Sequence, residues 1–132
     1  MWRYVNIGAW MMRHDQSIDM VTTFASTPMM HAHTAIPHQV LNLARAAATQ
    51  CRETLGRDIR VYWFGSWVKG CAIPRSDIDL AIDAGQTIAP DGMAALRERL
   101  DALPTLRQID LLDIHAVDDA LRHAIISEGI AL

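Results

Sequence analysis

The sequence predicts a small α+β domain in which a mixed sheet of three to four strands is backed by helices. Three kinds of pattern lead to this prediction: segments with helical periodicity, segments that alternate like strands, and one turn bracketed by glycines. The 132 residues, 51% of them hydrophobic, suit a single domain with one core. We expect that domain at residues 34–132, after an irregular N-terminal extension over residues 1–33.

The extension has no clean helical or strand period. The simplest interpretation is a loosely ordered terminus, or an upstream start with the natural protein beginning at Met29 or Met30. The alternative is a segment that docks on a partner through the aromatic residues Trp2, Tyr4 and Trp10.

The first regular element that the sequence predicts is a helix over residues 38–55. Apolar residues recur at helical spacing between Val40 and Leu55. Pro37 suits the first helical turn, and Gly56 suits the stop.

Two strands, separated by a turn and a loop, follow this helix. Residues 58–64, "DIRVYWF", alternate like a strand: the core side carries Ile59, Val61 and Trp63, and the polar side carries Arg60 and Tyr62. Residues 65–70, "GSWVKG", predict a turn plus a short helical piece, because glycines bracket them. Pro74 interrupts any regular pattern in the loop that comes next, and residues 77–83, "DIDLAID", form the second predicted strand.

A helix, a strand and a last helix complete the domain. The first of these helices starts near Pro90 and ends before Pro104. Residues 107–114, "RQIDLLDI", predict the third strand. The last helix carries Asp118 near the positive end of its dipole and stops at Gly129.

An acid pair opens the second strand. Asp77 and Asp79 share one face of a strand, because side chains at i and i+2 point the same way, and Asp83 joins that face further along. Two carboxylates at this spacing repel each other unless a cation lies between them. Hard oxygen ligands favour Mg²⁺ or Mn²⁺, and two such ions about 3.5–4 Å apart recur in phosphoryl-transfer sites.

The glycine-bracketed turn suits the phosphate side of such chemistry. Gly65 allows a tight turn and brings backbone N–H groups close to a ligand, while Ser66 offers a hydroxyl. Lys69, the only lysine in the chain, lies just before Gly70 and is placed to meet phosphate charge. Arg75 is a second basic candidate.

A third carboxylate is expected from the third strand. Asp110 and Asp113 point to opposite faces of that strand. An acid that faces inward without a partner is costly, so the inward one is expected to face ligand or metal. Spacing alone does not choose between the two.

These residues together resemble a known family. The "GS" pair, ten further residues and "DID" are similar to the GS-x10-DxD signature of the DNA polymerase β-like nucleotidyltransferase superfamily. The small size, "IDLLDI" and the ending "AIISEGIAL" resemble its minimal nucleotidyltransferase branch. The resemblance implies that Asp77, Asp79 and Asp110 bind two Mg²⁺ ions (or Mn²⁺) and carry catalysis, and that the Gly65–Ser66 turn holds the triphosphate of ATP.

The resemblance also implies a partner. Members of the minimal branch are commonly antitoxins that AMPylate a tyrosine hydroxyl of a HEPN-type ribonuclease toxin, with ATP as donor. Two alternatives stay open: an antitoxin that neutralises its toxin by binding alone, and a subunit of an aminoglycoside-type transferase. The second needs an acidic pocket, to which Asp83, Asp113 and Glu98 could contribute.

Composition excludes some other classes. A net charge of −3 argues against direct nucleic-acid binding, which needs a basic footprint, and no apolar run approaches the ~20 residues of a membrane span. Cys51 and Cys71 fit no metal or disulfide spacing and are expected to be free thiols in the reducing cytoplasm. For Trp67 we favour core packing over base stacking. The histidines, listed here, are expected to be solvated or helix-end residues rather than metal ligands or catalytic groups: His31, His33, His38, His115 and His123.

Overall fold

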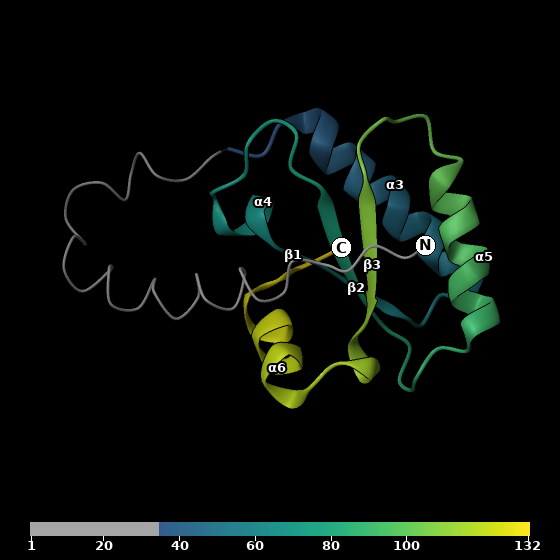
Figure 1. Ribbon diagram of the computed structural model, residues 1–132. Helices are drawn as coiled ribbons and strands as arrows, with labels where there is room; N and C mark the ends of the chain where they lie inside the picture. The colour runs from purple at the N-terminus through teal and green to yellow at the C-terminus, as the bar shows by residue number, and fades with distance from the viewer. Residues whose placement is uncertain (1–34) are drawn as a thin grey trace.

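The computed structural model describes residues 35–132, which form a four-stranded sheet flanked by helices (Figure 1). The expectations for residues 1–33 lie outside the described residues. The elements in chain order are α3 (His38–Leu55), β1 (Arg60–Phe64), α4 (Ser66–Lys69), β2 (Ile78–Asp83), α5 (Pro90–Asp101), β3 (Ile109–Asp113), the 3-10 turn η1 (Ile114–Ala116), α6 (Asp119–Glu128) and β4 (Ile130–Ala131).

The sheet is mixed, with the strand order β3-β2-β1-β4. β1 pairs antiparallel with both β2 and β4, whereas β2 and β3 are parallel and are connected through α5, as a parallel pair requires a crossover. The predicted mixed sheet of three to four strands is confirmed. Its fourth strand is only two residues long and pairs Ala131 with Tyr62.

The main core lies on the face of the sheet that α3 and α5 cover. Inward residues of the three long strands pack there against the apolar stripe of α3, which includes Val40, Ala44, Ala47 and Cys51. The helix bounds equal those predicted from the periodicity, because one continuous buried stripe defines them. Figure 1 shows α3 passing behind the sheet.

The opposite face carries a second, smaller core. Tyr62, Phe64, Ala81 and Leu112 pack there against α6. The sequence led us to expect Tyr62 on the polar side of its strand, and this expectation was wrong, since only 8% of Tyr62 is exposed. Asp118 is the N-cap of α6, and its carboxylate accepts a hydrogen bond from Leu121 N.

Candidate active site

Two of the predicted acids lie side by side on neighbouring strands. Asp79 of β2 and Asp110 of β3 are register partners in the parallel ladder, so their side chains share one face of the sheet. This is the face that α6 partly covers, because Ala81 and Leu112, two residues further along each strand, belong to its core. Asp110 is buried, with 5% exposed, and Asp79 is half-buried.

The glycine turn lies directly across from Asp79. Phe64, the last residue of β1, pairs with Asp79, so the next residue, Gly65, lies across from the carboxylate. Gly65 has φ of 91°, and a Cβ at this position would collide with Oδ2 of Asp79. Only glycine therefore allows both the backbone turn and the close approach of the carboxylate.

The predicted short helical piece after the turn is confirmed as α4. Gly65 and Gly70 flank it, and Gly70 adopts the left-handed conformation with φ of 75°. Cys71 N donates to the carbonyl oxygen of Ser66 at 3.0 Å, which closes the turn. Ser66 and Lys69 are both half-buried, on the same short element as the turn that faces Asp79.

The loop between α4 and β2 is fastened by two side chains. Trp67 is 3% exposed and its Nε1 donates to the carbonyl oxygen of Ser76 at 3.1 Å, which confirms its packing role. Arg107 Nη1 donates to the carbonyl oxygens of Pro74 and Ser76, each at 2.8 Å, and its guanidinium lies 5.5 Å from the Trp67 ring centroid. Sequence reasoning missed Arg107, because a cross-loop contact of this kind leaves no periodic pattern.

A second missed residue supports Asp110. Gln108 Nε2 donates to Asp110 Oδ1 at 2.8 Å. The two residues are i and i+2 at the start of a strand, so they share a face, and this spacing could have pointed to the contact. The hydrogen bond fixes the orientation of the Asp110 carboxylate.

Asp77 lies immediately before β2, half-buried, two residues ahead of Asp79. Among residues 35–132, no group of three or more His, Cys, Asp or Glu side chains is arranged to hold a metal ion as it stands. The donor set nevertheless fits a hard divalent cation, because Asp79 and Asp110 are adjacent carboxylates. The missing Cβ of Gly65 gives the Asp79 carboxylate the room to lie against the turn.

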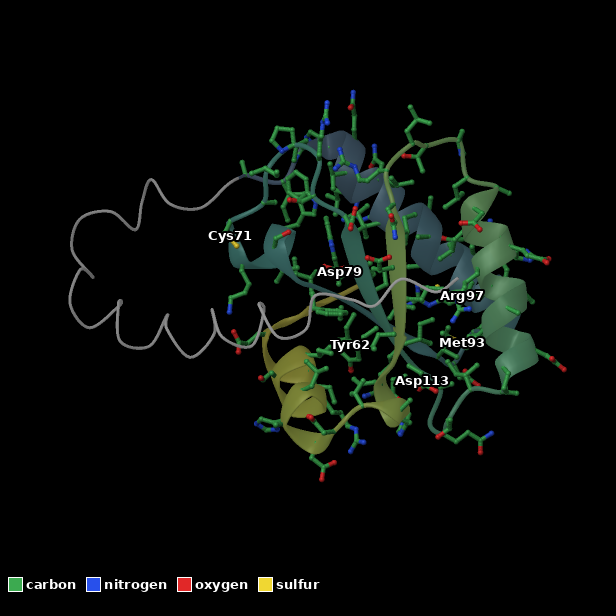
Figure 2. The ribbon with its side chains drawn as sticks, in the orientation of Figure 1. Tyr62, Cys71, Asp79, Met93, Arg97 and Asp113 are labelled. Atoms are coloured by element: carbon green, nitrogen blue, oxygen red, sulfur yellow. The ribbon has the colours of Figure 1, made fainter. Side chains whose placement is uncertain are left out.

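The acids at the far end of the same strands have other partners. Asp113 accepts hydrogen bonds from Ile88 N at 2.8 Å and from His115 N at 2.9 Å. It therefore fastens the loop before α5 and caps η1. Figure 2 shows Asp113 toward the lower end of β3, away from Asp79.

Asp83 is similarly engaged: it shares the face of Asp79, as strict alternation predicted, because β2 runs without a bulge from Ile78 to Asp83. It lies four residues along β2 from Asp79, about 13 Å at a strand's rise. Its carboxylate lies 2.7 Å from His115 Nε2 and accepts from Gly85 N at 2.9 Å. Burial raises the pKa of Asp83, but the two hydrogen bonds and the nearby His115 and Arg60 lower this pKa by more. The net pKa shift is therefore downward. His115 is thus a partly buried hydrogen-bond partner of Asp83 within the short turn η1.

The remaining predictions concern the thiols and membranes. Neither Cys51 nor Cys71 forms a disulfide, as expected, and burial raises the pKa of Cys51 to about 12, which leaves that thiol unreactive. No helix within residues 35–132 combines the length and the apolar character that a membrane crossing demands.

The family profile described as "Polymerase beta, Nucleotidyltransferase" matches residues 49–132, which include the turn, the acid pair and β3. The chain belongs to this nucleotidyltransferase family. The match begins inside α3 and continues to the last residue, so it covers nearly all of the described sheet.

Two solved structures share the fold. One is a crystal structure of a mutant of the toxin–antitoxin MntA–HpeT, with 21% identity and a TM-score of 0.52 over 67% of this chain and 70% of that one. The other is a toxin–antitoxin crystal structure with AMP-PNP, with 24% identity and a TM-score of 0.52 over 65% and 69% of the two chains. No curated protein matches the sequence significantly.

Proposed function

We propose that this nucleotidyltransferase transfers AMP from ATP to a hydroxyl, most simply a tyrosine hydroxyl, of a partner HEPN-type toxin, and so acts as the antitoxin. The observation that carries the proposal is the register that sets Asp79 beside Asp110 and opposite the Gly65 turn. This arrangement combines metal-binding carboxylates with a phosphate-sized turn.

The proposed metal ligands are Asp77, Asp79 and Asp110, with Mg²⁺ or Mn²⁺ as the ion. Two bound metal ions would neutralise phosphate charge and lower the pKa of the acceptor hydroxyl. Asp110, which Gln108 orients, is proposed to take the proton of the attacking hydroxyl.

The triphosphate is proposed to lie on the turn. The first N–H groups of α4, which follow Gly65, are proposed to donate to phosphate oxygens, because the N–H groups that open a helix have no carbonyl one turn earlier. Ser66 adds a hydroxyl and Lys69 a positive charge that stabilises the leaving pyrophosphate, while Gly70 ends the helix tightly enough to keep these groups together.

The toxin partner is supported by the shared fold of two toxin–antitoxin structures. One of those structures contains AMP-PNP, an ATP analogue. In the other, two aspartates two positions apart are replaced by glutamate, the same spacing as Asp77 and Asp79 here. Such a pair would act in the cytoplasm, without direct contact to nucleic acid or membrane by this chain.

The test is label transfer from α-³²P-ATP to the protein encoded beside this chain, with Mg²⁺. We expect the wild type to label that protein, and Asp79→Ala to reduce the rate by about 10³-fold or more, since metal-assisted stabilisation is worth several kcal/mol. Asp83→Ala is the control, because its carboxylate binds His115 at the far end of β2.

A second readout separates the alternatives. If cells remain protected from the toxin when Asp79→Ala is expressed, the protein neutralises by binding alone and the catalytic proposal is wrong. Label that appears on an aminoglycoside but not on the protein would identify the small-molecule transferase instead.

A further inference from the structure

A pocket of about 410 Å³ lies along the outer edge of β3. It is lined from the α5 side by Arg97 and Leu100, and from the strand by consecutive residues that include Gln108, Ile109 and Asp110. Side chains of consecutive strand residues point to opposite faces, so a pocket lined by them wraps the edge of the sheet. We name it the β3-edge pocket; Figure 2 shows Arg97 between α5 and β3.

The β3-edge pocket reaches the candidate site through Asp110, which belongs to both. Its position relative to the glycine turn follows from the strand order. β1 carries the turn at its end, β2 lies in the middle with Asp79, and β3 is the outer strand with Asp110. Among the described residues, no strand pairs with the outer side of β3.

This strand order separates the proposed position of the ATP donor from that of the attacking hydroxyl. An in-line displacement requires the attacking hydroxyl to approach opposite the leaving pyrophosphate. With the triphosphate on the Gly65 side, the hydroxyl must approach from the Asp110 side, and the β3-edge pocket opens there. A volume of about 410 Å³ is within the range of sites that bind small molecules or single anchoring side chains.

The rim of the pocket favours a protein over a small soluble acceptor. Leu106, on the loop from α5 to β3, is fully exposed and also lines the pocket. Ile73, on the loop before β2, is 65% exposed. Arg107 fastens these two loops together through its hydrogen bond to Pro74. A large apolar side chain held out at the rim of a pocket, with a second one exposed on the loop fastened to it, is typical of a surface that a protein covers.

We propose that the β3-edge pocket is the acceptor-docking site: a segment of the partner protein covers Leu106 with an apolar side chain, inserts a neighbouring side chain into the pocket, and so brings its hydroxyl to Asp110. The inference deepens the proposed function, and rests on it for the hydroxyl. The transfer step itself is balanced: the acceptor oxygen bonds to the α-phosphorus, the α–β bridging bond breaks, pyrophosphate leaves, and the hydroxyl proton passes to Asp110.

The test compares Leu106→Glu with Ile126→Glu, using the protein encoded beside this chain as the probe. Ile126 is the matched control, because it is also an exposed large apolar residue but lies on the outer surface of α6. We expect Leu106→Glu to weaken binding of the probe at least tenfold by calorimetry and to raise KM for the probe, with KM for ATP unchanged. Ile126→Glu should behave like the wild type.

Two results would overturn the inference: unchanged binding with Leu106→Glu, or an equal or larger loss with Ile126→Glu. A photo-crosslinking amino acid at position 106 gives a second measurement that does not need weakened binding. It should crosslink to the probe, whereas the same amino acid at position 126 should not. If the wild type transfers no label but Leu106→Glu still weakens binding selectively, the catalytic proposal fails while the docking site stands.

Discussion

The two ends of β2 and β3 carry the same residue type but do different work. At the end where both strands begin, Asp79 faces the Gly65 turn and Asp110 lies beside Asp79. At the end where both strands finish, Asp83 and Asp113 bind loop backbone and His115. Each strand thus carries an acid near both ends, and the residue type alone does not identify the functional one. The contacts of each carboxylate are what distinguish the two ends.

The candidate site also lies at the unexpected end of a parallel strand pair. Ligands of open parallel sheets bind beyond the carboxyl ends of the strands. Here the parallel pair presents its acids at the amino ends, because antiparallel β1 finishes there and delivers its glycine turn. The carboxyl ends of β2 and β3 are instead closed by loop contacts and η1.

At the catalytic end, the largest expected effect after that of Asp79→Ala comes from Gly65→Ala. The added Cβ would collide with the Asp79 carboxylate, and displacing a catalytic group by about 1 Å is enough to reduce kcat about 10²-fold. The positive φ adds about 1–2 kcal/mol of strain. Gly85→Ala is the matched control: its φ is 81° but nothing lies within 4 Å of its Cβ, so it should lose similar stability and no activity. Equal activity of the two variants would contradict the close approach to Asp79.

The opposite end should respond in stability rather than in rate. Asp113→Ala removes a buried carboxylate that accepts hydrogen bonds from two backbone N–H groups. We expect the free energy of unfolding to fall by about 2–3 kcal/mol, measured by urea denaturation, with kcat retained at a temperature where the variant is folded. A loss of kcat as large as that of Asp79→Ala would contradict the structural role and indicate that Asp113 takes part in catalysis.

A smaller effect is expected from Gln108→Ala, which removes the hydrogen bond to Asp110 Oδ1. Partners that orient metal ligands typically contribute 10–100-fold in metal affinity, and the exposed position of Gln108 places the effect at about 10-fold. The measurement is the Mg²⁺ concentration that gives half-maximal transfer. Gln108→Glu sharpens the test, since it keeps the size of the side chain and loses the donor.

The smallest effect is expected from Asp83→Asn, which weakens the contact with His115. The pair is partly exposed, so the change in unfolding free energy should be less than about 1 kcal/mol. Because folding lowers the pKa of Asp83, its contribution is present above the unfolded pKa of about 4 and is lost as pH falls through the folded value. The wild type should therefore lose its advantage over Asp83→Asn below about pH 4, in acid titrations of thermal stability; an advantage that grows with acid would contradict the pKa shift.

Local chemistry was enough for the order and bounds of most elements. The helix over residues 38–55 was predicted to the residue, because its apolar stripe, Pro37 and Gly56 all act within one or two turns. The fixed distance from the Gly65–Ser66 turn to Asp77 and Asp79 also came from the sequence alone, as did the family that this spacing resembles.

Only the tertiary structure decided how these elements share their surfaces. The choice between Asp110 and Asp113 depended on strand register and on loops that supply N–H groups from residues 25 positions away. The burial of Tyr62 needed α6, and the role of Arg107 needed a loop more than 30 residues distant. Pairing across strands and coverage by a later helix are non-local, so the periodicity within one segment cannot encode them.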